Sequence, residues 1–322
     1  MPLSKTGVVI MLLRIPTISV VIPLYNKRAH IERALQSVFS QTLKPDEVIV
    51  VDDGSTDGGG EWVLQEYGSG VRYLRQPNGG VSRARNRGIA EASYDYVAFL
   101  DADDRWEPHY LEEIHLLIHR FPKATAFTTA YQFVLGDQDY VDPAVRRLAL
   151  GGVRTLLDNF FEVCAHGDLP FHMSSLCMTK ALLNEVGGFP EGEPMGEDQD
   201  LFSKAALRGA LAYSRRVSSF YHMDADNRAC LNNIPEQECP FSQRLVSLAE
   251  RGELAPELRE SILDYTAGHL LHLASLNIRA GNLSAARRLL EDDRCRRRWK
   301  RYLWWQTRYL LASMREHPAI AA

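Results

Sequence analysis

An apolar run that ends in a cluster of carboxylates places the strongest constraint on how this chain can fold. Residues 96–100 read Tyr-Val-Ala-Phe-Leu, and Asp101, Asp103 and Asp104 follow within four positions. The run predicts a buried strand, and the carboxylates must lie at its exit because burying unpaired charges is costly. One interpretation is a site for Mg²⁺ or Mn²⁺ and a phosphate, since these cations prefer oxygen ligands. The other is a solvated acidic turn before the next helix.

The first 120 residues alternate four times between strand and helix patterns, with strands expected near residues 18–23, 47–51, 71–74 and 96–100. This alternation predicts an α/β fold with a mostly parallel sheet flanked by helices. Ligands of such sheets bind beyond the carboxyl ends of the strands. Polar residues follow three of the four strands: Tyr25 and Asn26, Asp52 and Asp53, and Asp101 to Asp104. Their expected convergence at one edge favours the ligand-site interpretation.

Two common phosphate-binding motifs are missing from this sequence. No G-x-G-x-x-G follows the first strand, and there is no G-x-x-x-x-G-K-[ST]. A phosphate would therefore be held through a metal rather than by a glycine-rich loop. A nucleotidyltransferase is a competing hypothesis, but it needs a basic, glycine-rich loop after the first strand, and residues 24–27 (Leu-Tyr-Asn-Lys) do not form one.

Bulk properties exclude several classes of protein. A net charge of −4 over 322 residues gives no reason to expect nucleic-acid binding. The five cysteines are scattered, odd in number and without C-x-x-C spacing, which favours a reducing compartment over structural zinc. No run approaches the ~20 apolar residues that span a membrane. We expect a cytoplasmic protein in which residues 1–17 are a poorly ordered leader rather than a secretory signal.

The pattern changes after residue 224, where only helices are expected. This predicts a catalytic or binding domain over residues 18–224 and a helical extension over residues 225–322. Residues 294–311 combine many arginines with adjacent aromatics. They fit either peripheral contact with the inner face of a membrane or a terminal helix that packs its aromatics on the domain.

Six short motifs occur in an order that resembles the family 2 glycosyltransferases, which have the GT-A fold. The resemblance extends from residue 18 to about residue 221, and the motifs occupy residues 20–26, 51–57, 84–88, 100–104, 187–189 and 196–201. It implies an inverting, divalent-metal-dependent transfer of a sugar from a nucleotide-sugar, by default a UDP-sugar, to a glycan or lipid-linked acceptor. Polysaccharide biosynthesis is the expected process.

The resemblance also implies roles for residues of the early motifs. Pro23 and Tyr25 would line the pocket for the base, and Asp52 or Asp53 would accept a hydrogen bond from the base or ribose. Which of the two aspartates points inward stays open, because adjacent residues leaving a strand face opposite ways. Arg85 is expected among the donor-binding residues.

The later motifs would supply the metal site. Asp101, Ala102 and Asp103 match the D-x-D element of the family, with Asp103 as the metal ligand and Asp101 near the ribose or a metal-bound water. Asp104 would either belong to this site or cap the next helix. His222, after a probable strand, is a candidate for an extra metal ligand or a diphosphate contact.

The chemistry of transfer would fall to the motif at residues 196–201. The resemblance implies that Asp198 is the general base that removes the proton of the acceptor hydroxyl. Glu197 would contact the donor or acceptor sugar, and His172 would lie near the acceptor. The hypothesis from a different class is a catalytically inactive module that binds sugar nucleotides or acts as a scaffold. Loss of Asp103 or Asp198 would have favoured it, and both are present.

Overall fold

The computed structural model describes residues 16–136, 139–148, 151–225 and 233–316, with side chains as far as Met314. The leader expected over residues 1–17 lies almost wholly outside these ranges. Within them, Cys164, Cys177, Cys239 and Cys295 are buried and unpaired.

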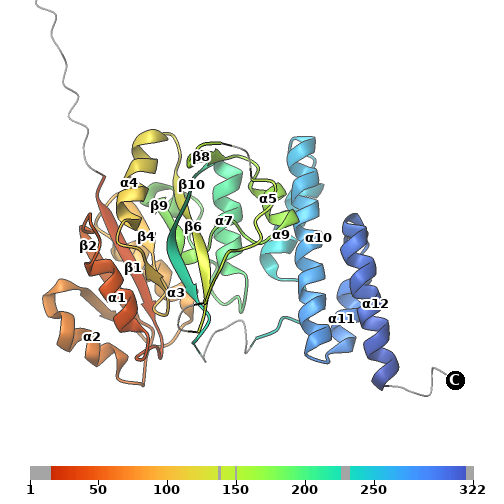
Figure 1. The fold of residues 1–322 in the computed structure, drawn as a ribbon, viewed down its shortest axis with the longest axis horizontal. Helices are drawn as coiled ribbons and strands as arrows, with labels where there is room; N and C mark the ends of the chain where they lie inside the picture. Colours follow the sequence, from red (N-terminus) through yellow and green to blue (C-terminus); the bar gives the residue numbers. More distant parts are fainter. Residues whose placement is uncertain (1–15, 137–138, 149–150, 226–232, 317–322) are drawn as a thin grey trace, which may run out of the picture.

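The described residues form a ten-stranded sheet with helices on both faces and a group of helices at one end (Figure 1). The strand order is β3-β2-β1-β4-β9-β6-β10-β5, while β7 pairs with β6 and β8 pairs with β10. The strands are β1 Ile18–Leu24, β2 Glu47–Asp52, β3 Arg72–Arg75, β4 Tyr96–Phe99, β5 Arg105–Trp106, β6 Ala126–Leu135, β7 Asp139–Val141, β8 Arg154–Leu157, β9 Leu176–Thr179 and β10 Leu211–His222.

Helices make up the remaining layers. The α-helices are α1 Ile31–Phe39, α2 Gly59–Tyr67, α3 Val81–Glu91, α4 Tyr110–Arg120, α5 Phe160–His166, α6 Lys180–Glu185, α7 Glu197–Arg208, α9 Pro240–Glu250, α10 Pro256–Arg279, α11 Leu283–Leu290 and α12 Trp299–Glu316. Short 3₁₀ helices occur at Gly68–Gly70, Met173–Ser175 and Asp293–Arg298. The basic segment expected as one helix from residue 294 therefore starts as a 3₁₀ turn, and α12 begins at Trp299.

Strand direction confirms the expected α/β class. β1 is parallel to β2 and β4, β2 is parallel to β3, and β6 is parallel to β10. β9 runs antiparallel between β4 and β6, so β6 and β10 point the same way as the first four strands. The carboxyl ends of β1, β2, β3, β4, β6 and β10 consequently lie at one edge of the sheet.

Two apolar clusters lie on the two faces of the sheet. One contains the buried faces of α1, α2 and α4, including the i, i+4, i+7 positions Ile31, Leu35 and Val38. The other contains apolar residues of α3, α5, α6 and α7 and continues without a break into α9, α10 and α11. The helices of the extension thus share one apolar core with the helices that cover this face of the sheet.

Candidate functional site

The strand ends at the carboxyl edge bring together the residues that the sequence marks. Tyr25 follows β1, Asp52 ends β2, Asp101 comes just after β4, and His222 ends β10. The register places Leu24 opposite Asp52 in the parallel β1–β2 pair, so these ends are adjacent. The convergence expected from the alternating pattern is therefore present.

Each of two strand-end carboxylates is paired with a cation of the chain. Lys27 Nζ lies 2.6 Å from Asp103 Oδ2, and Arg85 Nη2 lies 2.7 Å from Asp101 Oδ1. The side chain of Asp103 is 15% exposed and that of Asp101 is 24% exposed, so both remain accessible. The two cations offset the repulsion between carboxylates held this close.

Asp104 does not cap the following helix, which was one of its two expected roles. It is fully buried and accepts hydrogen bonds from Ser174 Oγ (2.5 Å) and the backbone N–H of His222 (3.0 Å). Burial raises the pKa of Asp104 well above its usual value, and Asp103 and Asp101 add to the rise. Asp104 therefore links the end of β10 to the turn after β4.

His222 lies beside this turn with an unpartnered ring nitrogen. The side chain is buried, its Nε2 atom has no hydrogen-bond partner among the described residues, and its Nδ1 atom lies 4.0 Å from Asp224 Oδ1. Burial, followed by the charge of Arg33, lowers the pKa of His222 to about 4. The imidazole is therefore neutral at pH 7, which is the form that binds metals.

Asp52 is fully buried and its carboxylate is held by neighbouring groups. It accepts hydrogen bonds from the Ser55 backbone N–H (2.7 Å) and the Tyr73 hydroxyl (2.5 Å). Gly60 is required beside it, because a Cβ atom there would lie 2.4 Å from Asp52 Oδ2. Asp52 thus ties β2 to β3 and α2.

Asp53 is also buried and accepts hydrogen bonds from the turn before α3. Its donors are Gln76 Nε2 (2.7 Å) and the backbone N–H groups of Gly79 and Gly80 (3.0 and 2.8 Å). Both aspartates of the β2 end therefore have protein partners.

The remaining predicted donor-binding residues differ in exposure. Tyr25 is 47% exposed beyond β1, as a stacking surface requires. Pro23 is buried within β1. Ala102 is buried in the apolar cluster under α1 and α4, so its side chain faces the core.

Arg85 joins the turn after β4 to the start of α7. This buried residue of α3 contacts Asp101 at 2.7 Å and Glu197 at 3.2 Å. Burial lowers the pKa of Arg85, but the two carboxylates outweigh that effect, so the guanidinium stays charged. The neighbouring arginines do not share this position: Arg87 donates to the backbone of Arg75, and Arg83 is exposed.

Asp198 lies in the first turn of α7 beside this charge network and is partly buried. Burial is the largest cause that raises the pKa of Asp198 to about 7. Glu197 adds to the rise, whereas Arg85 and the Gln199 backbone N–H lower the pKa. A carboxylate with a pKa near 7 is suited to accept a proton at neutral pH.

The start of α7 is held by the helical extension. Gly196 has φ 91°, and a Cβ atom there would lie 2.7 Å from the ring of Phe241 in α9. Arg244 of α9 contacts Asp200 at 2.6 Å, and the Tyr265 hydroxyl of α10 donates to Gln199 Oε1 at 2.8 Å. These contacts position the turn that carries Asp198.

Asn86 connects α3 to the loop before α7. Its Nδ2 donates to the carbonyl of Phe189 at 2.9 Å, and its Oδ1 accepts from the N–H of Phe189 at 2.9 Å. We expect Asn86→Ala to lower the free energy of unfolding by about 1–3 kcal/mol, because both peptide groups lose their partner. Urea unfolding measures this change.

The matched control for this substitution is Gln36→Ala. Gln36 is exposed, and its side chain donates a hydrogen bond to Glu32 in the same helix. We expect a change within about 0.5 kcal/mol. Equal effects of the two substitutions would contradict the linking role of Asn86.

Several residues of the site were not identified from the sequence. Arg33 of α1 donates to the carbonyl of Asp103 and pairs with Asp224 at 3.0 Å. Lys27, which pairs with Asp103, lies in the loop after β1, and no sequence motif marks it as a partner of that carboxylate.

His172, which is expected near the acceptor, has a largely buried side chain. Its Nε2 atom lies 2.8 Å from Ser219 Oγ, and burial lowers the pKa of His172 to about 3.

Comparisons with known proteins agree with this arrangement. Residues 19–165 match the model of "Glycosyl transferase family 2". The chain is 27% identical over 239 residues to an uncharacterized glycosyltransferase of Rickettsia felis, which covers 73% of this chain and 39% of that protein. It is 28% identical over 244 residues to one of Rickettsia typhi, covering 73% of this chain and 74% of that protein. The chain thus spans less than half the length of some relatives.

Solved structures with the same fold include TarS of S. aureus. The TarS 1-349 structure in complex with UDP-GlcNAc has a TM-score of 0.64, 17% identity, and coverage of 85% of this chain and 81% of that chain. The TarS 1-349 structure described without a ligand has a TM-score of 0.59 and 20% identity, with 85% and 82% coverage. At such identities the likeness shows the fold. The family match places residues 19–165 of this chain in glycosyl transferase family 2.

Proposed function

We propose that the chain is an inverting, divalent-metal-dependent glycosyltransferase that moves a sugar from a nucleotide-sugar to a hydroxyl of a glycan or glycolipid acceptor. The observation that carries the proposal is the ion-pair network in which Arg85 joins Asp101 of the D-x-D element to Glu197, the neighbour of Asp198 at the start of α7. Burial raises the pKa of Asp198 in this network to about 7. Family membership supports sugar transfer. The TarS structures in complex with UDP-GlcNAc and UDP make UDP the first nucleotide to test.

The proposed reaction assigns the proton and the leaving group as follows. Asp198 takes the proton of the acceptor hydroxyl, whose oxygen attacks the anomeric carbon opposite the diphosphate. The new bond forms between that oxygen and the anomeric carbon, and the bond to the phosphate oxygen breaks. The nucleoside diphosphate leaves with the bonding electrons, and the sugar configuration is inverted. Arg85 holds Asp101 and Glu197 in place and lowers the pKa of the base.

Residues at the edge of the sheet fit a divalent cation. Asp103 presents a partly exposed carboxylate, and His222 presents a buried Nε2 atom that no residue in the described part of the chain contacts by a hydrogen bond. Among the described residues, no group of three or more His, Cys, Asp or Glu side chains is arranged to hold a metal. Diphosphate oxygens would complete the ligand set, as is common for Mg²⁺. The cation, Mn²⁺ or Mg²⁺, would neutralise charge on the leaving diphosphate.

Calorimetric titration of UDP, GDP and TDP, each with Mn²⁺ and then with EDTA, tests this proposal. We expect one nucleotide to bind only with the metal. If none binds with metal, a sugar-nucleotide-independent scaffold becomes the better account of the fold.

The pKa of Asp198 predicts the pH dependence of transfer. Only the ionised carboxylate accepts a proton, so kcat/KM should rise with pH and reach half its plateau near pH 7. Below that pH Asp198 is protonated and transfer is lost. Initial rates from pH 5.5 to 8.5, with donor affinity measured at the same pH values, separate this effect from weaker binding.

The variant Arg85→Met tests whether Asp198 is the group that titrates in the pH profile of kcat/KM. Arg85 lowers the pKa of Asp198, so its removal should move the midpoint of the profile to higher pH. A profile that is flat in the wild type, or unmoved in Arg85→Met, would contradict Asp198 as the titrating base.

Cell-surface polysaccharide biosynthesis is the proposed process, with the protein acting in the cytoplasm. A glycolipid acceptor would place it at the inner face of the membrane.

A further inference from the structure

The outer face of α12 is an exposed apolar surface. Trp299, Leu303, Trp304, Leu310 and Leu311 are each between 53% and 59% exposed, and Met314 is 48% exposed. They lie on one side of the helix, because the opposite side packs Tyr302, Trp305 and Tyr309 against the core. We call this outer side, Trp299 to Met314, the α12 face.

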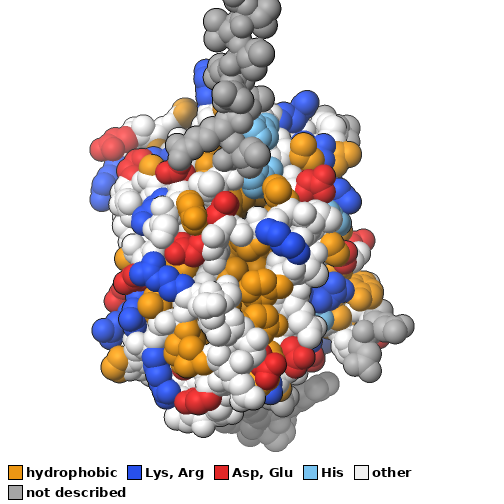
Figure 2. Space-filling view, turned by 90° about the vertical axis from the view of Figure 1, so that its left-hand side faces the viewer, with side chains coloured by type: hydrophobic (Ala, Val, Ile, Leu, Met, Phe, Trp, Pro, Cys, Tyr) orange, Lys and Arg blue, Asp and Glu red, His pale blue; other side chains and the backbone are white. Residues whose placement is uncertain are grey.

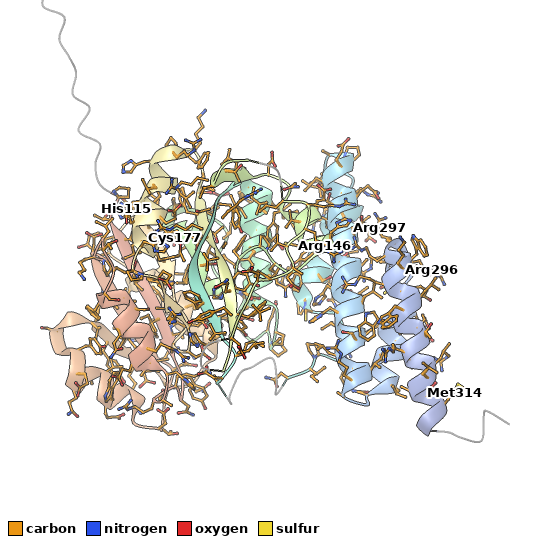
Figure 3. The ribbon with its side chains drawn as sticks, in the orientation of Figure 1. His115, Arg146, Cys177, Arg296, Arg297 and Met314 are labelled. Carbon is orange, nitrogen blue, oxygen red and sulfur yellow. The ribbon has the colours of Figure 1, made fainter. Side chains whose placement is uncertain are left out.

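α12 is the outermost helix, at the end of the molecule opposite α2 (Figure 1). Met314 lies at the far end of this helix, at the edge of the molecule (Figure 3). The 18 residues of α12 form a helix about 27 Å long. Among the described residues, no helix is long and apolar enough to cross a membrane. A flat surface is therefore a more suitable partner than the interior of a bilayer.

Basic residues accompany the apolar side chains of the α12 face. Residues 299–314 contain Lys300, Arg301 and Arg308 and no acidic residue, although the whole chain has a net charge of −4. Lys300 lies 5.4 Å from the ring of Trp299, and Arg308 lies 4.7 Å from that of Trp304. By contrast, acidic and basic side chains are interspersed around an apolar patch on the face that carries α1 and α2 (Figure 2).

We propose that the α12 face binds the surface of a lipid bilayer that contains anionic headgroups. Tryptophans with adjacent lysine or arginine suit the interface, where the rings lie among acyl chains and the cations reach the headgroups. Because the rest of the chain is acidic, attraction to anionic lipid is directed to this one end of the molecule.

A second copy of the chain is a weaker candidate for this surface. A two-fold interface would place the same face against itself. Lys300 and Arg308 would then approach their own counterparts, residues 299–314 would offer no acidic partner, and like charges at an interface oppose association. Charge complementarity thus favours anionic lipid.

Vesicle flotation with the full chain tests the proposal. The vesicles contain phosphatidylcholine alone or phosphatidylcholine with phosphatidylglycerol. We expect binding to the anionic vesicles only, weakened by salt. Lys300→Glu/Arg308→Glu should weaken it at least about tenfold, and Trp304→Ser/Leu311→Ser should also reduce it. Lipids brominated in their acyl chains should quench tryptophan fluorescence in the wild type.

Matched controls separate the α12 face from general effects of charge and hydrophobicity. Arg120→Glu/Lys123→Glu changes the net charge equally at exposed positions near the end of α4, and Leu64→Ser/Val153→Ser removes two other exposed apolar side chains. Both controls should bind anionic vesicles as the wild type does. Equal loss in the controls, no binding by the wild type, or a wild-type dimer that Trp304→Ser/Leu311→Ser abolishes would each overturn the proposal. Because the assay contains no donor or acceptor, its result is independent of the proposed transfer.

Discussion

Asp198→Asn should reduce the turnover number by a factor of ~10²–10⁴ while the affinity for the donor nucleotide stays nearly unchanged. Asparagine has nearly the same shape as aspartate, so the first turn of α7 and its contacts with α9 and α10 are preserved. The amide cannot accept the proton of the acceptor hydroxyl. Steady-state rates at pH 8, combined with calorimetry of the donor nucleotide, separate the loss of chemistry from a loss of binding.

Glu32→Gln is the matched control for this variant. Glu32 lies in the first turn of α1, is exposed, and loses one negative charge in the same way. It should transfer sugar at the wild-type rate. Normal turnover by Asp198→Asn would rule out the role of general base, and an equal loss of donor affinity would make Asp198 a binding residue instead.

Asp103→Asn should weaken metal-dependent binding of the donor nucleotide at least ~100-fold, since even outer partners of metal ligands cost 10–100-fold when removed. The amide retains an oxygen but loses the charge that a hard cation requires. Titration of the nucleotide with Mn²⁺ and with EDTA measures this effect. We expect the two conditions to become nearly equal in the variant.

Asp293→Asn controls for the loss of one aspartate charge. Its side chain is 84% exposed and lies in the 3₁₀ turn before α12, far along the chain from the sheet edge. Wild-type metal dependence is expected. If Asp103→Asn retains the full difference between Mn²⁺ and EDTA, the metal is held elsewhere.

The fold class could be predicted because its signals are local. Alternation of β-branched runs with amphipathic helices determines the direction of β1 to β4, and direction alone places their carboxyl ends at one edge. Tyr25, Asp52 and Asp101 were therefore correctly expected to converge. The same logic fails for β9, whose short apolar run gives no indication that it pairs antiparallel between β4 and β6.

The partners of the strand-end carboxylates were not predictable in the same way. Arg33 pairs with Asp224 across 191 residues of sequence, and no local pattern marks such a pair. For Asp104, a local sequence preference is misleading. An aspartate before a helix is a good cap by local preference, but tertiary packing gave it Ser174 and the N–H of His222 instead.

The contacts between α7 and the extension have a consequence for how such chains can be recombined. Consider a chimaera with residues 18–224 from one relative and the extension from another. The first turn of α7 and the helix α9 would then come from different proteins, and their side chains would not match. The counterparts of Gly196, Phe241, Arg244 and Tyr265 would have to be transferred as a set. In this chain, the extension supports the turn that carries Asp198.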